Sequence, residues 1–430
     1  MLTLKKAQRL LLAAILLLTT CNIDAQTRSD SLVVAYLEDT YGVRFTRNNR
    51  LVYFKTGQEK FDDLFAAVRQ AKKSIHLEYF NFRNDSISDL LFSLLEERAK
   101  AGVEVRAVFD GFGNSSNNRP LQRRHLDSLQ ARGIDIVEFD PLRFPYFNHA
   151  FHRDHRKIVV IDGIVAYTGG MNVADYYIKG KEEFGEWRDI HVRVEGDVGD
   201  DLQKIFLEFW KKTTGKDVHG PEYYSGGRDA RKFFSGLKQD TTQTAGRKML
   251  GVVDRGPRSD RRIIHDTFVR CIDAAEHEVE IINPYLTLCP HIRKALRRAC
   301  QRGIDVKIMI SSKSDIPITP RVVEHNAHRL MKKGARVFVF EGGFHHSKIL
   351  MVDGRYAFVG SANLNSRSLS NDYECNLLVA DEDSTEELRR IFDEDRREKC
   401  WELTPETWKK NFSPGRRFAA WFWQFLTPFL

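Results

Sequence analysis

Hydrophobic residues along the chain alternate between helical and strand periodicity. Within 61–71 they recur at the spacing of one helix face, at Phe61, Leu64, Phe65, Val68 and Ala71. A strand pattern over 74–80 follows, then a second helical pattern over 87–100 and a second strand pattern over 103–109. Gly102 is the expected stop of the second helix. This part of the chain therefore predicts helix, strand, helix and strand in that order.

The same order of elements returns in the second half of the chain. Helical patterns over 264–275 and 291–301 alternate with strand patterns over 278–282 and 304–310. A further strand pattern closes each half, and its two copies cover 133–139 and 334–340. Strands that alternate with helices imply a sheet covered by helices. We therefore predict an α/β protein of two similar lobes.

The segments around the repeats differ from them in composition. Two short apolar runs, 32–36 and 50–55, precede the first repeat and have the composition of strands. Residues 223–248 are rich in Gly, Ser, Thr, Gln and charge, which is typical of a linker. We therefore place one lobe in 26–222 and the other in 249–400.

One short motif, H-x-K-x4-D, occurs once in each lobe. Its two copies consist of His155, Lys157 and Asp162, and of His346, Lys348 and Asp353. An apolar run precedes each Asp, and the Asp-Gly pair that follows is typical of a hairpin turn before a second strand. The match continues in register to Gly170 and Asn172 in the first copy, and to Ser361 and Asn363 in the second. A gapless repeat of this length is not a chance match.

Each motif offers an imidazole beside an ammonium, because residues two apart in a strand point to the same face. Two such pairs suit attack on a phosphodiester: one neutral imidazole attacks phosphorus, and the other, protonated, gives its proton to the departing alkoxide. The groups expected to hold the phosphate oxygens are Lys157, Lys348, Gly170, Asn172, Ser361 and Asn363. Two ammonium groups beside two imidazoles would repel a divalent cation. We therefore expect no metal and no cofactor.

At these residues the sequence resembles the phospholipase D superfamily and, within it, the bacterial cardiolipin synthases. The segments that carry the resemblance are 155–163, 167–172, 187–196 and 360–368. It extends from about Asn49 to the C-terminus. The resemblance implies two homologous lobes, each a mixed β-sheet flanked by helices, related by a pseudo-two-fold axis with the active site between them. It also implies that His155 is the nucleophile and His346 the general acid and then base.

Carboxylates near the two imidazoles are needed to fix their tautomers and to stabilise the imidazolium. Asp189 and Glu374 each open an apolar strand downstream of a motif, and the resemblance implies this role for both. The alternative is that each is a surface charge at the end of a strand. For Asp162 and Asp353, a position in an Asp-Gly turn gives a structural role that is sufficient by itself.

Charge and the ends of the chain add information about location. Lys and Arg exceed Asp and Glu by eight, which favours an anionic partner. Residues 1–25 have basic residues, a short apolar run and a small residue at position 25, the pattern of a secretory signal, with lipidation at Cys21 as an alternative. Six scattered Cys without C-x-x-C spacing give no sign of a disulfide framework.

Residues 401–430 are rich in aromatic side chains. From Phe418 onward these side chains follow helical spacing, and basic residues precede them. A helix of this kind is typical of the membrane interface. The alternative is a C-terminal helix docked on the protein core.

The sequence therefore predicts a phosphatidyltransferase that converts two phosphatidylglycerol molecules to cardiolipin and glycerol through a phosphatidyl-histidine intermediate. The expected partners are an anionic phospholipid and a membrane surface, without nucleic acid. The expected location is exported, in the periplasm or cell envelope, with peripheral attachment to the membrane. The alternatives are a phospholipase D that releases phosphatidic acid, a nuclease of the same superfamily, and a catalytically dead lipid-binding protein.

Overall fold

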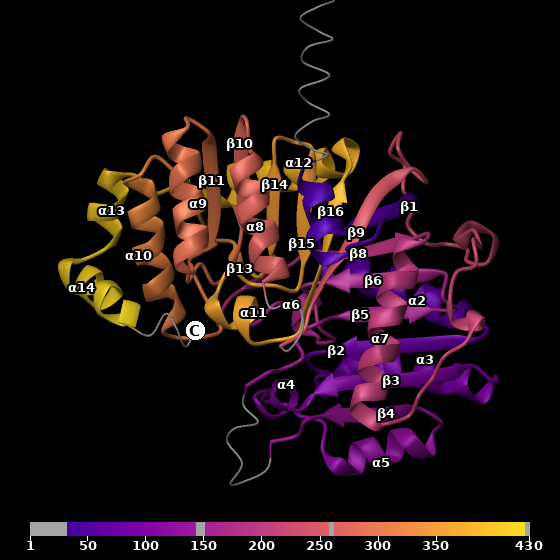
Figure 1. Cartoon of the computed structure of the whole chain (residues 1–430). Coiled ribbons are helices and arrows are strands. Elements are labelled where there is room, and N and C mark those ends of the chain that lie inside the picture. The colour runs from indigo at the N-terminus through magenta and orange to yellow at the C-terminus, as the bar shows by residue number, and fades with distance from the viewer. Residues whose placement is uncertain (1–31, 143–150, 258–261, 426–430) are drawn as a thin grey trace, which may run out of the picture.

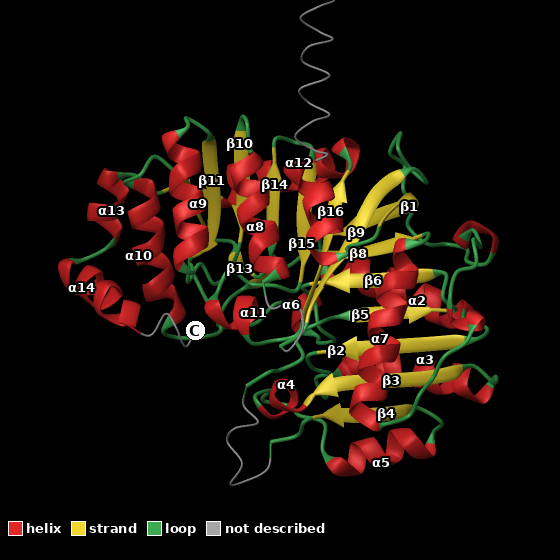
Figure 2. Ribbon diagram, in the orientation of Figure 1, coloured by secondary structure: helices red, strands yellow, loops and turns green. Residues whose placement is uncertain are grey.

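The computed structural model describes residues 32–142, 151–257 and 262–425 (Figure 1). The predicted leader, 1–25, and the last part of the predicted tail, 426–430, lie outside these ranges. Both halves of the chain consist of strands with helices beside them (Figure 2). The predicted α/β class is confirmed.

Fifteen strands of the described residues form one sheet. At its centre, β1 (Phe45–Phe54) and β9 (Lys248–Arg255) pair in antiparallel orientation. Outward from β1 come β8 (His191–Glu195), β6 (Val165–Gly169), β5 (Ile158–Ile161), β2 (Ser74–Tyr79), β3 (Glu104–Asp110) and β4 (Asp135–Phe139). Outward from β9 come β16 (Glu374–Ala380), β15 (Tyr356–Gly360), β14 (Ile349–Val352), β10 (Glu278–Ile282), β11 (Asp305–Ser311), β12 (Arg336–Phe340) and the edge strand β17 (Cys400–Glu402).

Apart from the edge strand β17, the two halves of this sheet have the same strand order and the same pairing directions. The three outer strands β2, β3 and β4 are parallel, as are β10, β11 and β12, and the strands between them and the centre are antiparallel. This arrangement is the predicted pseudo-two-fold pair of mixed sheets. The two sheets are joined through β1 and β9 into one.

Helices cover both faces of the sheet, because alternate side chains of each strand point to opposite sides. On one face, separate cores lie under α2 (Gly57–Gln70), α3 (Ser86–Lys100) and α5 (Arg123–Ala131) in the first half, and under α8 (Ile263–Ala274), α9 (Pro290–Gln301) and α10 (Thr319–Met331) in the second. On the other face, α7 (Val198–Thr214) and α12 (Glu382–Lys399) pack on a core that runs across both halves. The two lobes therefore share one apolar layer.

Both predicted Asp-Gly hairpins are present. Asp162 and Gly163 connect β5 to β6, and Asp353 and Gly354 connect β14 to β15. All four residues have positive φ, between 53° and 66°, which is the type I′ arrangement that suits the twist of a hairpin.

A second, two-stranded sheet joins the lobes where the chain approaches the motifs. β7 (Glu186–Arg188) and β13 (Gly343–His345) pair in parallel orientation. Gly343 has a φ of 154°, and a Cβ at this position would lie 2.1 Å from the Glu186 carbonyl oxygen. The close approach of β7 and β13 therefore requires Gly343. It brings Arg188 beside His345, directly before the second motif.

The prediction of a strand over 32–36 is wrong, because residues 32–41 are helical. Val33, Val34 and Leu37 are buried, and Val33 and Leu37 pack in the core of the second half. A run of five apolar residues is too short for its period to distinguish a helix from a strand. Gly42, with a φ of 67°, ends this helix.

The predicted linker and the start of the predicted tail both pack on the lobes. The segment 223–248 buries Ala230, Phe234 and Leu237 against the first half. α13 (Pro405–Asn411) and the residue that follows it bury Trp408 and Phe412 in the core of the second half. The remaining short helices are α4 (Gly111–Ser115), α6 (Tyr176–Lys179), η2 (Pro221–Tyr223), η3 (Ala230–Lys232) and α11 (Ser366–Ser370).

The last described helix, α14 (Pro414–Phe422), lies against α10. Arg416 forms an ion pair with Glu324, and Gln424 Nε2 donates to the Val322 carbonyl at 3.2 Å. The large side chains left exposed on this segment are Phe418, Trp421, Phe422 and Phe425. No described helix is both long enough and apolar enough to span a bilayer.

Candidate active site between the two halves

The two His-Lys pairs lie in the loops that lead into β5 and β14. The sequence predicts these residues within strands, whereas the strands begin directly after each Lys. The backbone of each His is bonded to the other half of the chain: His155 N donates to Tyr373 O at 3.0 Å, and His346 N donates to Arg188 O at 2.6 Å. Each motif is therefore held against the opposite lobe.

Each imidazole contacts a carboxylate from the other half. His155 Nδ1 lies 3.1 Å from both carboxylate oxygens of Glu374, and His346 Nδ1 lies 2.8 Å from Asp189 Oδ2. Both carboxylates are fully buried. Because Nδ1 of each ring faces a carboxylate, Nε2 is the candidate nitrogen for chemistry. The site is therefore a reciprocal pair of His-carboxylate contacts, and both halves are needed to form it.

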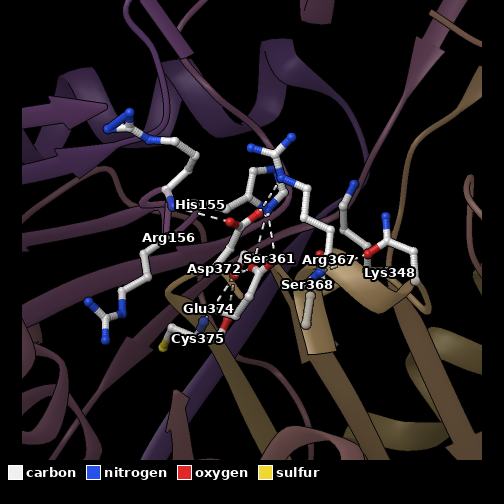
Figure 3. A network of polar contacts seen from close by, with 12 residues as sticks. His155, Arg156, Lys348, Ser361, Arg367, Ser368, Asp372, Glu374 and Cys375 are labelled. Atoms are coloured by element: carbon white, nitrogen blue, oxygen red, sulfur yellow. Dashed lines mark hydrogen bonds and ion pairs between the residues drawn. The ribbon is translucent and has the colours of Figure 1, made fainter. Parts of the chain in front are cut away.

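The two carboxylates have different supports. Ser361 Oγ donates to Glu374 Oε2 at 2.5 Å, and Figure 3 shows the Glu374 carboxylate between Ser361 and His155. At the position equivalent to Ser361 the first half has Gly170, where a Cβ would lie 2.2 Å from Asp189 Oδ1. Only Gly fits there, so Asp189 has no counterpart of the serine hydroxyl.

The four residues predicted to bind phosphate differ in what they can offer. The Ser361 hydroxyl is used on Glu374, and the Gly170 backbone N–H donates to Ile190 O at 3.0 Å. Asn172 and Asn363 are each 5% exposed, and within the described residues the Oδ1 atom of each has no hydrogen-bond partner. Because a phosphate oxygen needs a donor, the amide nitrogens of Asn172 and Asn363, and not these carbonyl oxygens, are the candidates of this set for binding it.

The lysines lie beside the histidines of their own motifs. Lys348 Nζ is 3.0 Å from His346 Nδ1 and 3.1 Å from Nε2, and Lys157 Nζ donates to the His155 carbonyl at 2.5 Å. Burial lowers the pKa of Lys157 to about 7 and that of Lys348 to about 8. The positive charge at the site therefore depends on pH in the neutral range.

The surroundings of the two histidines favour neutral imidazoles. Burial lowers the pKa of His155 and of His346, and the neighbouring ammonium groups lower it further, while the paired carboxylates act in the opposite direction. For Glu374, burial acts to raise the pKa, but the contacts with His155 and with Ser361 lower it. An ionised carboxylate beside a neutral imidazole is the arrangement needed for attack by the ring nitrogen.

The two motif aspartates lie at the far end of β5 and β14 from the histidines. Asp162 accepts hydrogen bonds from the backbone N–H groups of residues 72, 73 and 74, at 2.8, 2.7 and 3.0 Å. Asp353 accepts them from residues 276, 277 and 278, each at 2.8 Å. These contacts tie each hairpin to the start of the neighbouring strand, and they provide the structural role expected for an Asp-Gly turn.

Comparison with known proteins identifies the family of this chain. The protein-family description "Cardiolipin synthase, PLD-like domain" matches residues 64–210 and 268–396, one segment in each half. The chain belongs to the cardiolipin synthase family. It is 32% identical over 371 residues to a cardiolipin synthase of Listeria monocytogenes, covering 86% of this chain and 73% of that protein. It is also 32% identical over 400 residues to a cardiolipin synthase of Oceanobacillus iheyensis, covering 93% of this chain and 79% of that protein.

The fold seen in this member of the cardiolipin synthase family also occurs in a solved structure. Phosphatidylserine synthase from Haemophilus influenzae superposes with a TM-score of 0.69, over 93% of this chain and all of that one, at 14% sequence identity. At this identity the likeness concerns the fold. It supports the two-lobed arrangement of the sheet.

Two groups at the site are absent from the sequence prediction. Lys60 of α2 is fully buried, and its ammonium donates to the Asn172 carbonyl at 3.3 Å and lies 4.0 Å from the Phe61 ring centre. The sequence does indicate that Lys60 is buried, because it occupies the same helix face as Leu64. Tyr285 has its ring 5.9 Å from that of His346 and donates its hydroxyl to Asp315 at 2.5 Å.

Proposed function

We propose that this protein transfers the phosphatidyl group of one phosphatidylglycerol molecule to a second, which gives cardiolipin and glycerol. The observation that carries the proposal is the reciprocal contact of His155 with Glu374 and of His346 with Asp189. Membership of the cardiolipin synthase family supports the choice of substrate and acceptor.

In the first step, Nε2 of neutral His155 attacks phosphorus. A P–N bond forms, the P–O bond to the headgroup glycerol breaks, and the leaving oxygen takes a proton from Nε2 of His346. The anionic phosphate of the bound lipid raises the pKa of His346, so that this ring is protonated when the lipid binds. The assignment of the nucleophile follows the family resemblance.

In the second step, His346 acts as the base. Its Nε2 takes the proton of a glycerol hydroxyl on the second phosphatidylglycerol, the hydroxyl oxygen attacks phosphorus, and the P–N bond to His155 breaks. Lys157 and Lys348 stabilise the negative charge on the non-bridging oxygens, and the amides of Asn172 and Asn363 bind the same oxygens. Glu374 and Asp189 hold the two rings in their reactive tautomers.

The test is a turnover assay on vesicles of pure phosphatidylglycerol in the presence of a chelator, with the lipid products identified by mass spectrometry. We expect cardiolipin and glycerol, and we expect both to be lost in His155→Ala and in His346→Ala. His219→Ala is the matched control, since His219 is exposed and lies in the loop that follows α7, outside the site. Phosphatidic acid alone would assign the protein to the hydrolases, and unchanged lipid would contradict the proposal.

We further propose that α14 attaches the protein to the membrane surface. Phe418, Trp421, Phe422 and Phe425 are between 49% and 69% exposed, and Arg417 lies next to them in the sequence. Exposed aromatic rings beside basic residues suit the interface of an anionic bilayer. Co-flotation with phosphatidylglycerol vesicles should fall in Trp421→Ser with Phe425→Ser, and not in the control Leu90→Ser, an exposed apolar residue of α3. Equal flotation of all three proteins would contradict this attachment.

The proposed location is the outer side of the membrane that bounds the cytoplasm. The leader-like pattern of residues 1–25 supports export, and the exposed face of α14 supports peripheral attachment. The mass of the mature N-terminus in cells tests export. A product that begins near Gln26 is expected, and a full-length N-terminus in every cell fraction would contradict it.

A further inference from the structure

A lysine from the protein itself occupies a group of aromatic rings near His346. The Lys181 ammonium lies 4.8 Å from the ring centre of Tyr176, 5.5 Å from that of Phe184 and 4.8 Å from that of Trp187. We call these three rings the aromatic box. Several aromatic faces around one point are the chemistry by which proteins bind ammonium ions, and quaternary ammonium ions above all.

The backbone fixes Lys181 in this position. Lys181 N donates to Gly185 O at 2.9 Å, and Gly185 N donates back to Lys181 O at 2.6 Å. Gly180 has a φ of 71°, and a Cβ at this residue would lie 2.3 Å from the Gly185 carbonyl oxygen. The loop is therefore closed tightly at its base, and the lysine side chain starts from a defined point beside the box.

The ammonium is held mainly by the rings. The side chain is only partly exposed, and within the described residues no carboxylate oxygen forms an ion pair with Lys181. Burial lowers the pKa of Lys181, and the charge of Asp315 acts to raise it. A cation placed on aromatic faces without a close carboxylate partner is the arrangement a bound ammonium ligand would adopt.

The box adjoins the ring that protonates the leaving group. The centres of the Trp187 and His346 rings are 5.6 Å apart, and Phe344 contacts both rings at 4.8 and 5.3 Å. In the proposed reaction His346 gives its proton to the oxygen of the departing headgroup. A headgroup that extends from His346 toward Trp187 approaches the box, and the nitrogen of a choline headgroup would be only two carbons from that oxygen.

We propose that Lys181 selects the headgroup: its ammonium fills the aromatic box beside His346, excludes headgroups that carry a quaternary ammonium, and favours those that carry hydroxyls. This inference rests on the proposed phosphatidyl transfer. An ammonium on the wall of the site repels a second cation. It also has three N–H donors, which can bind the hydroxyl oxygens of a glycerol headgroup.

The test compares glycerol release from phosphatidylglycerol vesicles with choline release from phosphatidylcholine vesicles. In Lys181→Ala the box is open, and the ratio of choline release to glycerol release should rise by about tenfold, the scale of one cation-aromatic interaction. Lys181→Arg keeps a cation in the box and should keep the selectivity of the natural protein. Lys179→Ala is the matched control, because Lys179 is exposed and forms an ion pair with Asp175 outside the box.

If the Lys181→Ala variant still releases glycerol but releases no more choline than the natural protein, the inference is overturned. If Lys181→Ala is inactive on both lipids, binding of tetramethylammonium to the folded variant decides, by calorimetry against the natural protein. Binding by the variant alone supports the inference, and equal or absent binding overturns it. Failure of the proposed function is separate, since the natural protein would then form no cardiolipin from phosphatidylglycerol, whatever the variant does.

Discussion

His155 and His346 each take a carboxylate from the other half of the chain, so neither half holds a complete reactive group. Glu374 and Asp189 are fully buried, and each contacts the Nδ1 atom of its partner ring. A buried carboxylate in this position fixes the ring tautomer and stabilises the imidazolium that forms during proton transfer. The supports of the two carboxylates differ, since Ser361 donates to Glu374 and Gly170 leaves no such group beside Asp189.

Replacing Glu374 by Gln should lower kcat by about 10²- to 10⁴-fold, because the amide keeps the shape but no longer stabilises the tautomer with reactive Nε2. Single-turnover measurement of glycerol release reports this step directly. Asp372→Asn, a change of the same kind two residues earlier in the chain, is the control. An equal loss in both variants would contradict a specific role of Glu374.

The rate should fall on the alkaline side as the two lysines lose their protons. Below pH 7 both ammonium groups are charged; as pH rises through about 7 for Lys157 and about 8 for Lys348, the charge that stabilises the phosphate oxygens is lost. The profile of kcat/KM, which reports groups of the free enzyme, should therefore decline over this range. In Lys157→Arg and Lys348→Arg the decline should move to higher pH, because Arg keeps its charge. An unchanged profile in both variants would assign the decline to another group.

At the scale of single elements, the sequence predicts what local periodicity controls. The helices and strands of both repeats and both Asp-Gly hairpins occur where their patterns place them. The segment 32–36 was assigned to the wrong class, because its burial against the second half decides its structure and no local pattern reports this contact. The strands that follow the histidine loops begin later than predicted for the same reason, since the backbone N–H groups of the two histidines donate to Tyr373 and Arg188 of the opposite half.

The hairpin aspartates belong to this scale. Asp162→Ala removes the acceptor of three backbone hydrogen bonds, and Ala is disfavoured at a φ of 53°. We expect a loss of about 3 kcal/mol in the free energy of unfolding. Urea denaturation measures this loss, and Asp127→Ala, an exposed aspartate of α5, is the control. An unchanged midpoint together with lost turnover would show that Asp162 acts directly in the reaction.

At the scale of the whole molecule, the duplicated halves form one sheet with one composite site. The repeat in the sequence is sufficient to predict two lobes and the two His-Lys pairs. The exchange of carboxylates was not predictable, because Asp189 and Glu374 each follow the histidine of their own half in the sequence and contact the histidine of the other half in space. This exchange of carboxylates depends on the pairing of β7 with β13, which brings the two halves of the chain together.

The central claim is that the composite site forms a phosphatidyl intermediate on His155. The most direct measurement uses the His346→Ala protein with a phosphatidyl ester of p-nitrophenol, a leaving group that needs no general acid. Peptide mass spectrometry after denaturation should then find the phosphatidyl group on the peptide that contains His155, with one equivalent of p-nitrophenol released. A phosphatidyl group on another residue, or release of p-nitrophenol without any covalent adduct, would contradict the account.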